Sequence, residues 1–113
     1  MKVYGTNLSI VRGDSGSITI SLSDNDDVKI PLVNGDMVYF TVKLNTGTDI
    51  KLIQKVITVF SDGNAIIDIE PGDTATLAYK SYKYDIQVVN LAGKVTTIVP
   101  PSLFIVEPEI TFD

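Results

Sequence analysis

The feature that most restricts the fold is a two-residue alternation of apolar and polar side chains, which recurs in short segments along most of the chain. Side chains of a β-strand point alternately to opposite faces, so this period predicts strands with one buried face and one exposed face. The side chains predicted to face inward are Ile18, Ile20, Leu22, Val28, Ile30, Leu32, Val38, Phe40, Val42, Leu44, Tyr82, Tyr84, Ile86 and Val88. The sequence therefore predicts an all-β fold.

Gly, Asn, Asp and Pro residues separate these segments and predict where the chain turns. Asn34-Gly35 and Asp62-Gly63 tolerate the positive φ angles of tight hairpins, so the strands that flank each dipeptide are expected to pair antiparallel. Longer hairpin loops are expected at 45–49 and 91–93. The predicted strands span residues 7–11, 16–23, 28–33, 37–44, 50–60, 64–70, 81–90, 94–99 and 103–107.

Eight or nine short strands with one apolar face each do not fit one flat sheet. They are expected to form a two-sheet antiparallel sandwich, or a partly closed barrel. A chain of 113 residues has a common size for one domain, so residues 1–113 are predicted to be a single sandwich domain. Its 44% hydrophobic content is enough for a core without disulfides.

The segment EPGDTATLAYK, residues 70–80, departs from the alternation. Asp73 or Thr74 is a possible N-cap, which predicts one helical turn near residues 72–79. In immunoglobulin-like sandwiches such a turn crosses between the sheets just before a strand that opens with an inward tyrosine, and Tyr82 stands at that position. Its hydroxyl is expected to bond to the backbone near Asp73 or Thr74. An immunoglobulin-like sandwich is therefore expected.

Pro100 and Pro101 are expected to interrupt the last predicted strands. Two consecutive prolines remove two backbone N–H donors, so residues 94–107 are not expected to be one continuous central strand. The chain is expected to bend there and to change partners or lie at an edge.

Missing residue types narrow the chemistry. Cys and His are both absent, which removes thiolate sites, a cysteine nucleophile and the commonest general base. There is no GxSxG motif and no glycine-rich phosphate loop. We therefore expect no enzymatic activity, cofactor or metal. The acidic residues that a glycosidase could use are more simply charges that block strand pairing at sheet edges; they are Asp68, Glu70, Asp73 and Asp85.

Two short motifs have a functional interpretation and a simpler structural one. Arg12-Gly13-Asp14 spells an integrin-binding tripeptide, but it falls between two predicted strands, where Gly and Asp are expected as turn formers. The run 24–27, DNDD, offers oxygen ligands for a hard cation such as Ca²⁺. It lacks the glycine and the closing glutamate of the twelve-residue calcium loop, so a solvated loop is the preferred interpretation.

Net charge and hydropathy limit the partners. The formal charge is −5 and the basic residues are scattered, whereas binding to nucleic acid needs a concentrated positive field. No apolar run has the length of a signal-peptide core or a membrane span. We expect synthesis in the cytoplasm without a signal peptide, and neither nucleic acid nor membrane as a partner.

Outward aromatic side chains indicate a contact surface. Tyr39 lies between two inward residues and should face outward, together with either Phe104 or its neighbour Ile105. Such a surface can stack on a sugar or contact another subunit. Phe112, in the apolar C-terminal segment, is the third aromatic residue assigned to it. The apolar side chains near the C-terminus also favour a homo-oligomer; they are Phe104, Ile105, Val106, Ile110 and Phe112.

Five segments carry a resemblance to a known family: RGDSGSITISL, NGDMVYFTVK, IEPGDTATL, YKYDIQVVN and TTIVPPSLFIVEPEIT. Together they resemble short tail-associated proteins of phages and prophages of Gram-positive bacteria, and in particular the N-terminal domain of phage baseplate upper proteins. The similarity runs from about Asn7 to Ile110. Its most recognisable parts are Tyr84-Asp85-Ile86 and the Pro-Pro before the last strand.

The resemblance implies a sandwich-fold component of a phage tail tip or baseplate, which becomes part of a virion. Such a protein is expected to be non-enzymatic and to act by assembly with itself or with other tail proteins. The alternative from another class is a carbohydrate- or receptor-binding, adhesin-like module, because a fold does not determine its function.

Overall fold

The all-β prediction is confirmed. The computed structural model describes residues 1–110, with residues 2–4 described by their backbone alone. The described elements are, in chain order, β1 (Lys2–Tyr4), β2 (Asn7–Val11), β3 (Gly16–Ile20), β4 (Leu22–Ser23), β5 (Lys29–Ile30), β6 (Met37–Lys43), β7 (Ile53–Ile57), β8 (Ala65–Ile69), α1 (Pro71–Thr74), β9 (Ser81–Val89) and β10 (Val95–Glu107).

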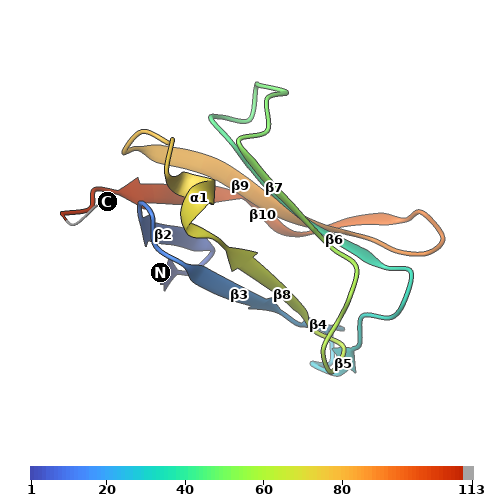
Figure 1. Ribbon diagram of the computed structural model, residues 1–113. Helices are drawn as coiled ribbons and strands as arrows, with labels where there is room; N and C mark the ends of the chain where they lie inside the picture. Colours follow the sequence, from blue (N-terminus) through green and yellow to red (C-terminus); the bar gives the residue numbers. More distant parts are fainter. Residues whose placement is uncertain (111–113) are drawn as a thin grey trace.

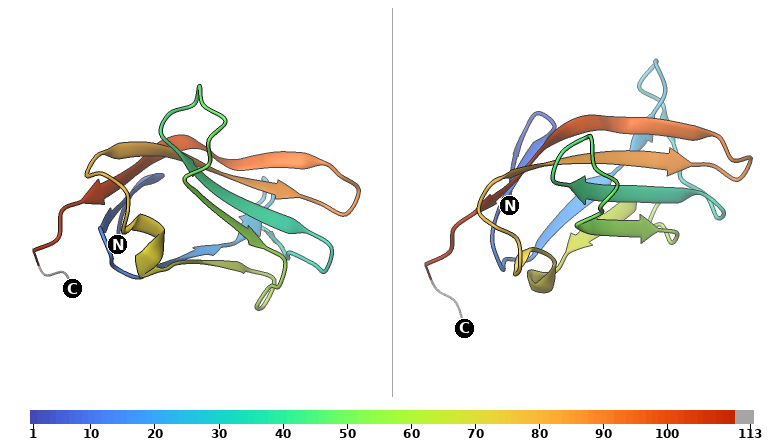
Figure 2. Two further views of the ribbon diagram at one scale, coloured as in Figure 1. Left: turned by 45° about the horizontal axis from the view of Figure 1, so that its top comes forward. Right: turned by 90° about the horizontal axis from the view of Figure 1, so that it is seen from above.

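The strands form two layers. Six of them make one sheet in the order β1-β2-β10-β9-β6-β7, while β3 pairs with β8 and β4 with β5. Figures 1 and 2 show the β3–β8 pair lying across one face of the large sheet. Every pairing is antiparallel except that of β2 with β10, which is parallel. The large sheet is therefore mixed, whereas the sequence predicted antiparallel pairs only.

The core lies between these layers. The alternation in β6 and β9 buries Val38, Phe40 and Val42 from one strand and the tyrosines and apolar residues of the other. Phe40 contacts Tyr84 and Phe104, with ring centroids 5.4 and 6.1 Å apart, and β8 closes the core from the opposite layer with Ala65, Ile67 and Ile69. The inward predictions for these strands are confirmed.

The helical turn before β9 exists, but it begins earlier than predicted. It spans Pro71–Thr74, and its N-cap is Glu70, so neither Asp73 nor Thr74 has that role. Asp73 instead occupies the third helical position, where its carboxylate accepts the backbone N–H of Glu70 at 2.7 Å. Glu70 and Asp73 thus form a reciprocal capping box, with a carboxylate in place of the usual hydroxyl at the N-cap.

Tyr82 is buried at the corner that leads into β9. Its hydroxyl donates to the carbonyl oxygen of Ala78 at 2.8 Å. The expected bond to the backbone near Asp73 or Thr74 is therefore wrong. The helical turn ends at Thr74, so Ala78 is the closer carbonyl, four residues before the tyrosine.

Strand β10 runs through Pro100 and Pro101, so the predicted break in the strand is wrong, whereas the predicted edge position of the prolines is confirmed. Its register against β9 shifts between Thr97 and Val99 and again between Val99 and Ser102. Because the register changes at these bulges, the ladder does not need the backbone N–H groups that Pro100 and Pro101 lack. On its other side β10 pairs with β2 only from Phe104 to Glu107, so the prolines lie where that edge has no neighbour.

The two dipeptide turns form, but they do not join paired strands. Asp62 and Gly63 both have positive φ, and the flanking Ser61 and Asn64 exchange two backbone hydrogen bonds of 2.9 Å. Beyond that single bridge the chain diverges, because β7 belongs to the large sheet and β8 pairs with β3. Asn34-Gly35 likewise precedes β6 without pairing it to β5. The two longer loops do connect antiparallel neighbours, as predicted.

Three predicted core residues are exposed instead. β5 pairs with β4 at the end of the molecule, away from the six-stranded sheet (Figure 1), which leaves Val28 and Ile30 59% and 48% exposed. Leu44 lies just beyond the end of β6 and is also exposed. None of the described helices is long and apolar enough to span a membrane.

Candidate functional site

The outer face of the large sheet carries ordered rows of polar side chains. Because alternate residues of β6 and β9 enter the core, the intervening ones project from the opposite face. The antiparallel register of these strands sets three pairs side by side: Tyr39 with Gln87, Thr41 with Asp85, and Lys43 with Lys83.

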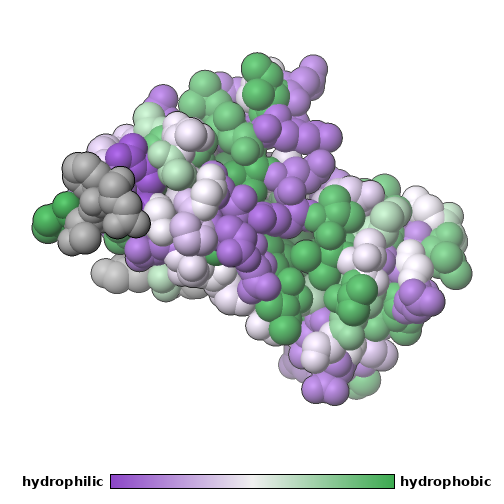
Figure 3. All heavy atoms as spheres, viewed as in Figure 1, coloured by the Kyte–Doolittle hydropathy of each residue, from purple (hydrophilic) through white to green (hydrophobic). Residues whose placement is uncertain are grey.

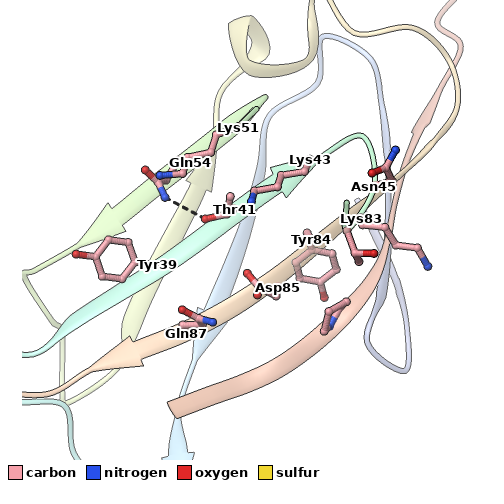
Figure 4. A pocket seen from close by; sticks show the side chains of 12 residues that line it. Tyr39, Thr41, Lys43, Asn45, Lys51, Gln54, Lys83, Tyr84, Asp85 and Gln87 are labelled. Carbon is pink, nitrogen blue, oxygen red and sulfur yellow. Dashed lines mark hydrogen bonds between the residues drawn. The ribbon is translucent and has the colours of Figure 1, made fainter. Parts of the chain in front are cut away.

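These rows form the floor of a concave groove of about 360 Å³ (Figure 4). Gln54 of β7 and Lys51 of the β6–β7 loop line the groove beside each other, and Asn45 of the same loop lies nearer Lys83 (Figure 4). Pro101 of β10 completes the lining. The volume falls in the range of about 300–1,000 Å³ that is usual for small-ligand sites.

Hydrogen bonds orient the amide side chains of the groove. Gln54 Nε2 donates to Thr41 Oγ1 at 3.1 Å, and Gln87 Nε2 donates to Thr97 Oγ1 at 3.3 Å. Each amide uses one of its N–H groups in this way, and its oxygen remains an acceptor for a ligand. The groove therefore offers both donors and acceptors at fixed positions.

Tyr39 lies half-buried at one end of the groove, as the outward prediction requires (Figure 4). Its hydroxyl contacts the sulfur of Met37 at 3.5 Å, and a thioether is a weak acceptor. Both the ring and the hydroxyl are thus available to a ligand. Tyr84 has a different position, because its ring is in the core and its hydroxyl donates to the carbonyl of Thr6. Burial raises the pKa of the Tyr84 hydroxyl, which keeps it a donor.

The assignment of Phe104 to a contact surface is wrong. Phe104 is fully buried, since the phase of β10 after the bulges turns Ser102, Phe104 and Val106 inward and Ile105 outward. The sequence left the choice between Phe104 and Ile105 open, and the register against β9 decides it. Phe112 lies outside the described residues.

The Arg12-Gly13-Asp14 motif forms a turn after β2, as the simpler interpretation predicts. The guanidinium of Arg12 is held by Glu109, with Nη2 2.7 Å from Oε1 and Nε 3.0 Å from Oε2. It also lies 4.2 Å from the centre of the Tyr79 ring. The N–H of Gly13 donates to Thr74 Oγ1 at 2.9 Å, so the motif ties the end of β2 to the last residue of α1.

The acidic residues considered for metal binding or hydrolysis have local roles. Asp24 Oδ1 accepts the backbone N–H groups of Asp26 and Val28, which closes the loop. Asp73 binds Lys55 Nζ at 2.8 Å besides capping α1. Asp85 is the one carboxylate among the described residues that line the groove. Within residues 1–110 no group of three or more acidic residues has a geometry that could hold a metal ion.

The residues that sequence reasoning missed are the groove lysines. Lys43 and Lys83 could each be placed on an outward face by alternation, but their adjacency depends on the pairing of β6 with β9. Lys51 lies on the loop between β6 and β7, just before β7, and lines the same groove as Lys43 and Lys83. Neither the models of known protein families nor the curated proteins include a match to this sequence.

Proposed function

We propose that the chain is a non-enzymatic structural protein of a phage or prophage tail, at the baseplate or tail tip, and that it acts through protein–protein contacts. The resemblance of five sequence segments to phage baseplate proteins supports this role. Three of those segments cover β6, β9 and β10, which form the centre of the large sheet. In this proposal the chain is made in the cytoplasm and becomes part of a virion.

The fold is proposed to be an immunoglobulin-like variant of the β-sandwich. Two features support it: the layers pack face to face around one core, and Tyr82 bonds back to the backbone just before its strand, as a corner tyrosine does. The parallel pairing of β2 with β10 makes this a variant with a mixed sheet.

The observation that carries the assembly role is the apolar character of the β6–β7 hairpin and the segment after it. Large apolar side chains are exposed at five positions between residues 44 and 59, namely Leu44, Ile50, Leu52, Val56 and Val59. In Figure 3 hydrophobic residues reach the surface at the top of the molecule, where Figure 1 places the loop between β6 and β7. Exposed apolar surface of this kind is typical of protein contact sites.

The same hairpin offers an open strand edge. β7 is the last strand of the large sheet, so its outer N–H and C=O groups have no neighbouring strand among the described residues. Charges often protect such edges. Here the charged residue of β7, Lys55, forms an ion pair with Asp73, and Val56 projects on the outer face. The edge is therefore suited to pairing with a strand of another protein.

The role is tested by the composition of phage particles. Tail particles purified from the strain that encodes the chain are analysed by quantitative mass spectrometry, with tail-less heads from the same preparation as control. The proposal predicts that the chain is present in tails in a fixed ratio to the other tail proteins. Its absence from tails, or equal amounts in heads and tails, contradicts the proposal.

The groove favours a second function, that of a carbohydrate-binding module. Its aromatic ring and its fixed amide groups are the features that bind sugars. A glycan array distinguishes the two: saccharide binding that is lost in Tyr39→Ala supports the module, whereas an array without hits supports assembly alone.

A further inference from the structure

The groove is positively charged in a negatively charged protein. Lys43, Lys51 and Lys83 line it with Asp85 as the sole described carboxylate, which gives the lining a formal charge of +2, whereas the chain as a whole carries −5. A third of the nine basic residues therefore lies around one depression of the surface. Charge of one sign concentrated in a cleft attracts ligands of the opposite sign.

Two of these lysines lie directly opposite each other. Lys43 and Lys83 are paired in the register of β6 and β9 and share the outer face, where opposite Cβ atoms are about 4.5–5.5 Å apart. The ion pairs of the described residues are Arg12–Glu109 and Lys55–Asp73, so neither lysine has a carboxylate partner there. In Figure 4 the two side chains extend away from each other.

Like charges at directly opposed strand positions destabilise a sheet. If both side chains turn toward an anionic group bound above the pair, that group removes the repulsion and forms charge-assisted hydrogen bonds with both ammonium groups. The arrangement is thus unfavourable in the empty protein and favourable when an anion is bound. Residues that destabilise the folded protein, as this pair of like charges does, are expected at binding sites.

The rest of the groove selects a sugar among anions. Beyond the lysines the floor presents the hydroxyl of Thr41, the amides of Gln54 and Gln87 and the carboxylate of Asp85. These groups match hydroxyls, which both donate and accept. Tyr39 lies at the other end of the groove from Lys83 (Figure 4), where its ring can stack on the apolar face of a pyranose. A simple anion would use neither feature.

We infer that this groove binds an acidic oligosaccharide, a chain of pyranoses with carboxylate substituents. Tyr39 and Lys43 lie four residues apart on β6, about 13 Å along the strand, so different sugar units reach them. A carboxylate of one unit lies between Lys43 and Lys83, the ring of another stacks on Tyr39, and the hydroxyls bond to Gln54, Gln87 and Asp85. The inference rests on the carbohydrate-binding function proposed for this groove and not on the assembly role. The groove does share Gln54 of β7 and the β6–β7 loop with the hairpin that is proposed to make protein contacts.

Calorimetric titration of the full chain tests the inference with trigalacturonic acid, an oligomer of a uronic acid, and with maltotriose as a neutral trisaccharide. Trigalacturonic acid is expected to bind at least about tenfold more tightly than maltotriose, and added salt is expected to weaken its binding. Lys83→Gln and Lys43→Gln are each expected to lower its affinity about tenfold. Lys80→Gln, a change at an exposed lysine that does not line the groove, is the matched control and should leave the affinity unchanged.

A second pair of variants separates stacking from charge. Tyr39→Ala is expected to weaken trigalacturonic acid binding about fivefold, because the aromatic contact is lost, while Tyr39→Phe keeps the ring and retains binding. Tetraglutamate, an acidic peptide probe, is expected to bind more weakly than trigalacturonic acid and to be indifferent to Tyr39→Ala. The inference is overturned if trigalacturonic acid does not bind at millimolar concentration, if maltotriose binds equally well, if Lys80→Gln weakens binding as much as Lys83→Gln, or if tetraglutamate binds as tightly as the sugar.

Discussion

Lys43 and Lys83 lie opposite each other on neighbouring antiparallel strands, on the outer face of the sheet, and neither pairs with a carboxylate among the described residues. Two positive charges are thus held together by the same backbone register that forms the core on the opposite face, where Val42 and Tyr84 are paired one position away. The pairing of β6 with β9 fixes the backbone positions of the two lysines, while their ammonium groups extend away from each other (Figure 4), so a small repulsion is expected at low ionic strength.

Removal of one of these charges should stabilise the protein. Lys83→Gln is expected to raise the free energy of unfolding by about 0.5 kcal/mol, because it ends a like-charge contact across the sheet. Urea unfolding at low ionic strength measures the difference. The gain should shrink at 1 M NaCl, where the Debye length is about 3 Å. A loss of stability, or a gain that salt does not change, contradicts the like-charge contact.

The ion pair of Arg12 with Glu109 predicts a pH dependence. The hydrogen bond from Arg12 lowers the pKa of Glu109 below its ordinary value. A carboxylate whose pKa is lower in the folded state stabilises the protein above its unfolded pKa, about 4.3 for Glu, and loses this effect as the pH falls through the folded value. Wild type should therefore be more stable than Glu109→Gln at pH 7, and the difference should disappear in acid.

Thermal unfolding of both proteins between pH 7 and pH 3 measures this difference. Glu107→Gln is the control, since Glu107 is exposed and its carboxylate has no ion-pair partner in the described part of the chain. A difference between wild type and Glu109→Gln that stays constant or grows as the pH falls would rule out the ion pair as its origin.

Core substitutions test which side chains of β10 point inward. Phe104 is fully buried against Phe40 and Tyr84, so Phe104→Ala should cost about 3–5 kcal/mol of unfolding free energy. Ile105 projects on the opposite face and is only half-buried, so Ile105→Ala should cost much less. Chemical denaturation of both variants gives the two values, and equal values would mean that the strand is not in this phase.

The bond from Tyr82 to Ala78 is expected to support the corner before β9. Tyr82→Phe removes a buried donor and should cost about 0.5–1.5 kcal/mol. Tyr39→Phe removes a hydroxyl whose described contact is a thioether sulfur, and it should be nearly neutral. Urea unfolding that shows the same cost for both changes would contradict the corner bond.

Short sequence patterns correctly predicted the inward-facing residues and the tight turns, because both depend on the geometry of a few neighbouring residues. The alternation in β6 and β9 identified the inward residues, because the side-chain period of a strand follows from its backbone alone. The positive φ angles at Asp62 and Gly63 were likewise predicted from residue type. The pairing of strands was predicted less well. After Asp62-Gly63 the chain enters the other layer, where β8 pairs with β3 and buries Ile67 and Ile69 against the large sheet.

Non-local contacts explain the other differences. Pro100 and Pro101 predicted an interruption, but bulges and an open edge let β10 continue. The candidate site depends on such contacts throughout: Lys43 and Lys83 are forty residues apart in the chain and become neighbours only through the β6–β9 register. Tyr39 was assigned to the outer surface correctly, because its assignment needed only the phase of one strand.

Self-association through the β7 edge tests the assembly role most directly. Val56 and Ile66 are 45% and 44% exposed on different layers, so Val56→Lys and Ile66→Lys introduce the same charge at matched exposure. Sedimentation of wild type and Ile66→Lys at high micromolar concentration should show oligomers that Val56→Lys lacks. A strictly monomeric wild type, or the same loss of oligomers in both variants, would contradict assembly through this edge.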